Sequence, residues 1–133
     1  MRRIQDTYRG AALKCGSAIL MARLVVGAGR PIERTDVDAI EYSIYEIDLG
    51  RQVDRRVLAG HDCVALDVPG VLFNSLQKCR LWTLDDVGYN FCHELYVGQD
   101  RHVTRAGVHY QVQYKLTPTI GQTTIVRFQL RMP

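Results

Sequence analysis

The sequence has few of the features that mark several large protein classes. Its four cysteines form no Cys-x-x-Cys pair, and their spacings of 48, 16 and 13 residues match no zinc-finger pattern. The longest apolar stretch, 17–26, is interrupted by Arg23 and falls well short of the ~20 residues that a membrane-spanning helix needs. We therefore expect a chain with no membrane contact and no cofactor, whose thiols are free.

An excess of one charge is also missing. The net charge is +3 and the isoelectric point is about 8.8, well below the concentrated positive field of a dedicated nucleic-acid binder. No specific nucleic-acid partner is expected. Lysine is scarce, because only three of the 17 basic residues are lysines and the others are arginines. Arginine suits planar contacts at protein interfaces, although the base composition of a genome produces the same bias.

Candidate catalytic groups do not converge on one site. Asp85-Asp86, with Asp62 or Glu94, could supply paired carboxylates, but Asp-Asp-Val-Gly is more typical of a turn. Cys79 lies beside Arg80, which favours a lowered thiol pKa, yet no partner histidine is identifiable. We expect a protein that is not an enzyme and takes no small-molecule substrate.

A metal site has one candidate arrangement. His61-x-Cys63 and Cys92-His93 would give a Cys2His2 set if their strands were neighbours. Adjacent residues of a strand point to opposite faces, however, so Cys92 and His93 cannot easily bind one ion together. We expect no metal and predict that Cys63 and Cys92 are small buried groups. A zinc-stabilised module remains the weakest alternative.

What the sequence does contain is a long alternating pattern at its end. Residues 108–116 alternate apolar and polar, 117–121 supply a turn, and alternation resumes from Thr124. A period of two predicts an antiparallel hairpin with one buried face. The other face is either a solvated surface or a docking surface, and its residues are Gln111, Gln113, Lys115, Arg127, Gln129 and Arg131.

Turn signals divide the rest into short segments. Strands are expected over Ile19–Val26, Gln52–Leu58, Cys63–Val68 and Tyr89–Val97. Pro69-Gly70 predicts a short helix over 71–77, because proline is favoured in the first turn of a helix.

One segment, Thr35–Asp48, is ambiguous. Its apolar residues have helical spacing and Thr35 with Asp38 resembles a capping box, whereas its β-branched and aromatic content favours the strand that we predict. We expect residues 1–10 to be an arm or a weakly held edge segment, and residues 11–133 to be one domain. We expect an all-β fold, an antiparallel sandwich or small barrel of about seven to eight strands with one short helix.

Two stretches of the sequence resemble segments of known protein modules. Ala106–Val112 resembles the entry into a strand of immunoglobulin-like domains, where a glycine precedes a corner tyrosine, and this implies a structural corner at Gly107 and Tyr110. Gly29–Ile44 resembles the B-to-C passage of immunoglobulin-like modules in tailed-phage virion proteins, such as the N-terminal domains of baseplate upper proteins. The cysteine pair and core tryptophan of antibody-type domains are absent from the matching places, and 68–86 has no counterpart.

The resemblance implies an antiparallel immunoglobulin-like β-sandwich with a structural role. The expectation is a virion protein of a phage or prophage particle, assembled in the bacterial host cytoplasm, that contacts copies of itself and other virion proteins. Decoration, head–tail joining and a tail or baseplate position all remain open. The alternative is a small-ligand or carbohydrate-binding sandwich module, in which Trp82, Tyr89 and Tyr96 would line a groove.

Overall fold

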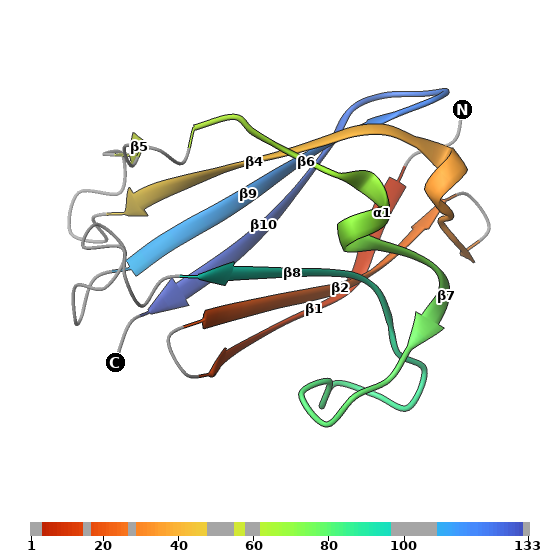
Figure 1. Ribbon diagram of the computed structural model, residues 1–133, viewed down its shortest axis with the longest axis horizontal. Coiled ribbons are helices and arrows are strands. Elements are labelled where there is room, and N and C mark those ends of the chain that lie inside the picture. Colours follow the sequence, from red (N-terminus) through yellow and green to blue (C-terminus); the bar gives the residue numbers. More distant parts are fainter. Residues whose placement is uncertain are drawn as a thin grey trace.

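The computed structural model describes residues 4–14, 17–26, 29–47, 55–57, 62–96 and 109–131. These residues form two five-stranded sheets, one four-residue helix and one 3-10 turn. Figure 1 shows the elements, which in chain order are β1 (Ile4–Lys14), β2 (Ser17–Val26), β3 (Arg30–Pro31), η1 (Arg34–Asp36), β4 (Val37–Ile47), β5 (Arg55–Val57), β6 (Val64–Leu66), α1 (Val68–Val71), β7 (Leu72–Gln77), β8 (Tyr89–Tyr96), β9 (His109–Pro118) and β10 (Thr124–Arg131).

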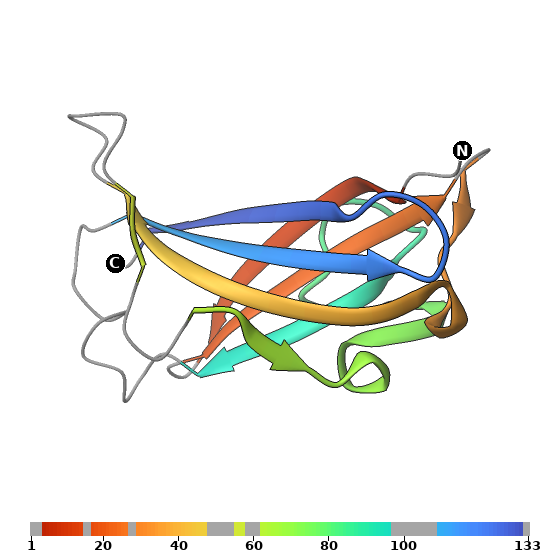
Figure 2. The same ribbon diagram turned by 90° about the horizontal axis from the view of Figure 1, so that it is seen from above.

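The chain contributes strands to the two sheets in turn. The first sheet has the order β1-β2-β8-β7, with β3 paired to β2, and the second has the order β10-β9-β4-β5, with β6 paired to β4. Every described pairing is antiparallel. The chain crosses between sheets after β3, after β6 and again after β8, and Figure 2 shows the strands of the two layers running obliquely to each other. The expected all-β class is confirmed.

The C-terminal hairpin is confirmed. Strands β9 and β10 pair from Leu116 with Thr124 to His109 with Arg131, and Gly121 takes a φ of 114° in the turn between them. The predicted alternation is visible in the exposure of the side chains. The buried inner residues of the hairpin are Tyr110, Val112, Tyr114, Leu116, Thr124, Val126 and Phe128.

The ambiguous segment is a strand, as predicted, and its helical features are confined to the turn before it. Strand β4 begins at Val37, directly after the one-turn η1. The cap is formed two positions earlier than expected, because the N–H of Glu33 donates to the carboxylate of Asp36 at 2.8 Å. Thr35 and Asp38 therefore do not form the predicted capping box, and Asp48 lies outside the described residues.

The helix predicted over 71–77 is wrong in its extent. Helix α1 covers only Val68–Val71, with Pro69 in its first turn, and Leu72–Gln77 forms β7. The reason is tertiary, because Leu72 pairs with Phe91 of β8 and is fully buried between the sheets. Burial of a large apolar side chain outweighs a weak local preference for helix.

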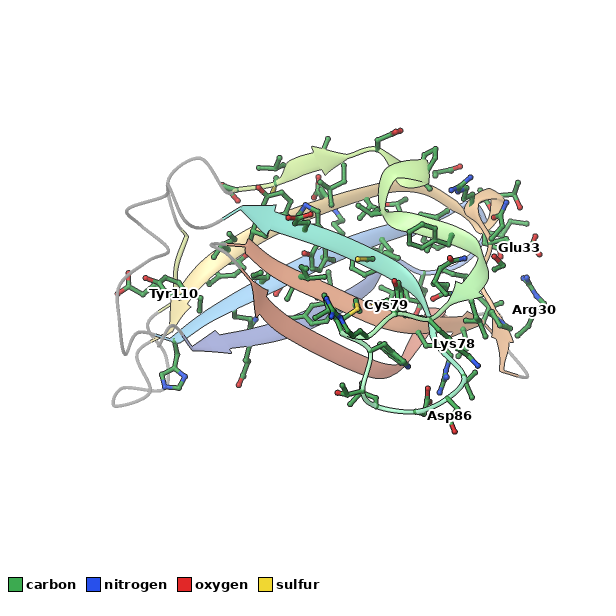
Figure 3. The ribbon with its side chains drawn as sticks, turned by 60° about the horizontal axis from the view of Figure 1, so that its bottom comes forward. Arg30, Glu33, Lys78, Cys79, Asp86 and Tyr110 are labelled. Carbon is green, nitrogen blue, oxygen red and sulfur yellow. The ribbon has the colours of Figure 1, made fainter. Side chains whose placement is uncertain are left out.

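Arg34 fastens the outer edge of β7. Its Nε donates to the carbonyl of Leu72 at 2.7 Å, and its Nη2 donates to the carbonyl of Pro69 at 3.3 Å. The N–H of Arg34 also donates to Oδ1 of Asn74 at 2.7 Å. The turn before β4 is thus joined to the helix and strand of the opposite layer, at the end of the molecule where Figure 3 places Glu33.

The N-terminal segment belongs to a sheet edge. Residues 4–10, where an arm or weakly held edge segment was expected, join 11–14 in β1, which pairs with β2 over its length. A bulge between Asp6 and Tyr8 shifts the register once. Strand β1 is therefore the edge of the first sheet, and it also contacts β10 at the edge of the second.

The core lies between the sheets and is rich in aromatic rings. Phe91 of β8 meets Tyr114 of β9 edge-on at 4.9 Å, and Tyr114 meets Phe128 of β10 at 5.6 Å. One imidazole is included, since Nδ1 of His93 lies 2.6 Å from the hydroxyl oxygen of Tyr114. Burial lowers the pKa of His93 to about 4, so the ring is neutral in the folded protein at neutral pH.

Asn90 completes the first sheet from within. Its side chain is almost fully buried, accepts the N–H of Leu24 at 2.8 Å and donates to the carbonyl of Leu24 at 2.9 Å. It also donates to the carbonyl of Ile32 at 3.3 Å. The β2–β8 ladder ends at Ala22 and Phe91, and beyond it the Asn90 amide bonds Leu24 together with the backbone N–H of Ile32, which donates to the Leu24 carbonyl at 3.0 Å.

We predict that Asn90→Ala costs about 2–4 kcal/mol of unfolding free energy, because it removes the acceptor of the Leu24 N–H and a donor to the carbonyls of Leu24 and Ile32. Urea unfolding measures this loss. Asn74→Ala is the matched control, since Asn74 is exposed and its removal should cost less than ~1 kcal/mol. Equal losses in the two variants would show that Asn90 is not a sheet-completing residue.

We predict a second effect from His93. The unfolded imidazole takes up a proton below its ordinary pKa of 6.5, whereas the folded one does so only near pH 4. The contribution of His93 to stability should therefore fall as pH drops from 6.5 to 4, by at most ~1.4 kcal/mol per pH unit, and stay constant below pH 4. His93→Gln should remove this dependence in urea unfolding measured across that range. An unchanged slope in the variant would contradict the assignment.

Candidate docking surface

The outward side of the second sheet carries most of the polar residues predicted for a site. We call it the outer face and define it as the outward residues of β10, β9, β4 and β6. Strand register sorts these residues into rows that cross the sheet. One row is Ile125–Lys115–Glu41–Ala65, and the next is Arg127–Gln113–Ser43. Each row is a set of side chains that emerge at the same level of the sheet.

Contacts within these rows link neighbouring strands. Nζ of Lys115 lies 3.8 Å from Oε1 of Glu41, which joins β9 to β4. Nε of Arg127 donates to Oε1 of Gln113 at 3.2 Å, which joins β10 to β9. Lys115 and Arg127 are exposed to solvent, so these contacts add little stability. Their effect is to orient the charged side chains.

The six predicted residues do not share one environment. Lys115, Arg127 and Gln129 are exposed and Gln113 is half-buried, as a surface role requires. Gln111 is only 4% exposed, and its Nε2 is buried without a hydrogen-bond partner. It is therefore not part of the open surface. Arg131 belongs to β10, but its side chain lies outside the described part of the chain.

Sequence reasoning missed the residues that β4 and β6 add. Glu41 supplies an acid next to Lys115, and Ala65 lies beside Glu41 and is exposed. The alternation of Ile40, Tyr42 and Ile44 places Glu41 outward, but the pairing of β4 with β9 was not visible in the sequence. The outer face is therefore of mixed charge, although the hairpin alone carries no acid.

The predicted corner tyrosine lies at one end of the sandwich. Tyr110 is fully buried near the start of β9, whereas Arg30 and Glu33 lie at the opposite end (Figure 3). Arg30 contacts the carboxylate of Asp36 there at 3.1 Å. Gly107 lies outside the described residues, so the corner itself stays a prediction.

The opposite side of the molecule is covered by the segment 78–88. It packs Trp82 against Tyr89 and Met21 on the outer side of the first sheet, with ring centroids of Trp82 and Tyr89 5.6 Å apart. Trp82 and Tyr89 are both buried, so they do not line the open groove expected of a carbohydrate module. The side chain of Tyr96 lies outside the described part of the chain.

Asp85 holds this segment in place. Its carboxylate accepts Nη2 of Arg23 at 2.6 Å and Nε1 of Trp82 at 2.9 Å, as well as the N–H groups of Val87 and Gly88. The Arg23 and Trp82 donors hold the pKa of this carboxyl well below its usual range. The predicted turn is confirmed, and Asp85 is a structural anion whose acceptor sites are occupied.

Gly88 closes the segment. It takes a φ of 110°, and a side chain there would collide with the backbone carbonyl of Gln77. Only glycine meets both conditions without strain. Nη1 of Arg23 also donates to the Gly88 carbonyl at 3.3 Å, so Arg23 of β2 holds both Asp85 and Gly88 of the segment.

The suggested metal ligands lie in different environments and do not form one site. Cys63 is exposed before β6 of the second sheet and is not the buried group expected, because its N–H donates to Oγ of Ser43 at 2.9 Å in a turn with positive φ. Cys92 is half-buried in the first sheet, and His93 faces the core. His61 lies outside the described residues, among which no cluster of three metal-binding side chains occurs.

The expected perturbation of Cys79 is found. Partial burial raises the pKa of this thiol, but hydrogen bonds from Tyr89 and from the backbone of Leu81 and Trp82, with the Arg80 charge, outweigh burial. The pKa of Cys79 therefore lies below its ordinary value. Figure 3 shows Cys79 over the first sheet, while Asp86 lies at the rim of the segment.

We predict that Asp85→Ala loosens the segment 78–88 and exposes Trp82, because the indole and Arg23 lose their shared acceptor. The emission of this single tryptophan should shift to longer wavelength and its quenching by acrylamide should rise. Asp86→Ala removes the same charge from an exposed neighbour and should leave both signals unchanged. A matching shift in the two variants would contradict the role given to Asp85.

Known proteins supply no relative for this arrangement. Comparisons with protein-family models, curated proteins and solved structures find no match for the chain. Among the described residues, no helix is long and apolar enough to cross a membrane. A function must therefore be inferred from the chain's own residues.

Proposed function

We propose that the protein is an immunoglobulin-like sandwich that works as a building block of a larger assembly. The strand order supports the fold, because β1-β2-β8-β7 facing β10-β9-β4 corresponds to the A-B-E-D and G-F-C sheets of immunoglobulin domains. The place of Tyr110 at the start of β9 also suits a corner tyrosine. The short strands β5 and β6 then occupy the side of the C strand, where immunoglobulin variants add extra strands.

The outer face of the second sheet carries the assembly function. It combines exposed cations, an acid and amides with apolar contributions from Ile125 and Ala65, and it is built on the long paired strands β4 and β9. Arginine and amide side chains on a rigid surface provide directional hydrogen bonds to a partner protein. This combination is the single observation that favours docking over a purely solvated sheet.

The assembly that we propose is a phage or prophage particle. The passage Gly29–Ile44 supports it, since a positive-φ glycine, a proline and a Thr-containing turn lead into the alternating strand β4, as in the virion modules that the sequence resembles. The partners are then copies of the chain and other virion proteins. A ligand-binding role has less support, because Trp82 and Tyr89 are used in packing.

We predict that the purified protein self-associates and that particles induced from its bacterial host contain it in many copies. Light scattering after size-exclusion chromatography measures the first property. Mass spectrometry and electron microscopy of purified particles, with antibody labelling, measure the second. A chain that is monomeric and never present on particles would overturn this function.

A further inference from the structure

The row of the outer face nearest the turn between β9 and β10 has a symmetric arrangement of chemistry. Across the sheet it places Ile125 on β10, Lys115 on β9, Glu41 on β4 and Ala65 on β6. Lys115 and Glu41 form the middle of the row and contact each other at 3.8 Å, and the two apolar residues flank them. Read from either end, the row is apolar, charged, oppositely charged and apolar.

We propose that the partner of this face is a second copy of the chain, packed face to face about a two-fold axis that runs along the strands between β9 and β4. This inference rests on the assembly function proposed above and names its first partner. A rotation about that axis brings Lys115 opposite Glu41 of the second copy, and Ile125 opposite Ala65 of the second copy. Each copy contributes both halves of every contact, as a two-fold interface requires.

Charge complementarity selects a second copy over other partners. A basic surface would meet Lys115 and Arg127 with like charge, and an acidic surface would do the same to Glu41. A second copy offers an opposite charge to both members of the central pair. The half-buried Ile125 and the exposed Ala65 add apolar contact on each side of that pair.

The size of the face predicts a weak dimer. Strands are ~4.8 Å apart and rise ~3.4 Å per residue, so about eight residues of β10, β9 and β4 cover roughly 14 Å by 27 Å, and the short strand β6 (Val64–Leu66) adds little to this area. That area is below the ~800 Å² per partner of a standard stable interface. We expect a dimer that dissociates on dilution in the micromolar range and tightens when many copies are held together in a particle.

Charge exchange tests this geometry. Lys115→Glu and Glu41→Lys should each weaken the wild-type dimer by about tenfold or more in sedimentation equilibrium, since like charges then meet twice across the axis. The double variant E41K/K115E should recover most of the affinity. Lys78→Glu and Asp86→Lys, which change exposed residues beyond the first sheet, are the matched controls and should have no effect.

A mixture of the two single variants is the decisive sample. In a two-fold pair of K115E with E41K, both intermolecular contacts become glutamate with lysine, so the heterodimer should be tighter than either variant's homodimer. Native mass spectrometry counts the three species. Thermal unfolding of each variant checks that the monomer is intact, as expected for an exposed ion pair.

The outcomes separate this inference from the proposed function. A wild-type dimer that is insensitive to these exchanges, or a statistical mixture of the single variants, overturns the two-fold interface and leaves assembly through another surface. A chain that stays monomeric at millimolar concentration also overturns the interface. The assembly function fails as well only if the chain is absent from purified particles.

Discussion

The fold depends on the contact between two inner faces that meet at Phe91 and Tyr114. A sheet with one apolar face is stable only when that face is covered, and here each sheet covers the other. The edge-on packing of these two rings joins β8 to β9 and brings Phe128 and His93 into the same cluster. Because the inner residues are committed to this contact, the alternate residues of β4, β9 and β10 must face outward, and this creates the outer face.

The sequence pattern predicted the strands that can be recognised from neighbouring residues alone. The alternation of Tyr110, Val112 and Tyr114 is a period-two signal that needs no partner to be recognised, and the hairpin followed from it. Strand β4 was recoverable for the same reason, although Val37, Ile40 and Ile44 also fit a helix. Strand β7 was missed because Leu72 is extended on account of Phe91, which lies 19 residues further along the chain.

The candidate site was predicted only in part, for a similar reason. The hairpin pattern identified Gln113, Lys115 and Arg127. Glu41 lies beside Lys115 because β9 pairs with β4, and this pairing cannot be predicted from the sequence of either strand alone. The burial of Gln111 depends on what surrounds it in three dimensions. The Asp85 contacts illustrate the opposite case, in which a local turn motif predicted the backbone contacts of the carboxylate, whereas its side-chain donors Arg23 and Trp82 were unexpected.

The attachment of Arg34 to the edge of β7 would have a consequence in the many-copy assembly that we propose. An uncovered strand edge can recruit the strands of neighbouring chains without limit, and this is a common route to aggregation. Here the guanidinium occupies the carbonyl of Leu72 and the adjoining turn occupies Asn74. A strand added at this end of β7 would have to displace Arg34, so in the proposed assembly association through surfaces that close after a fixed number of subunits would be favoured.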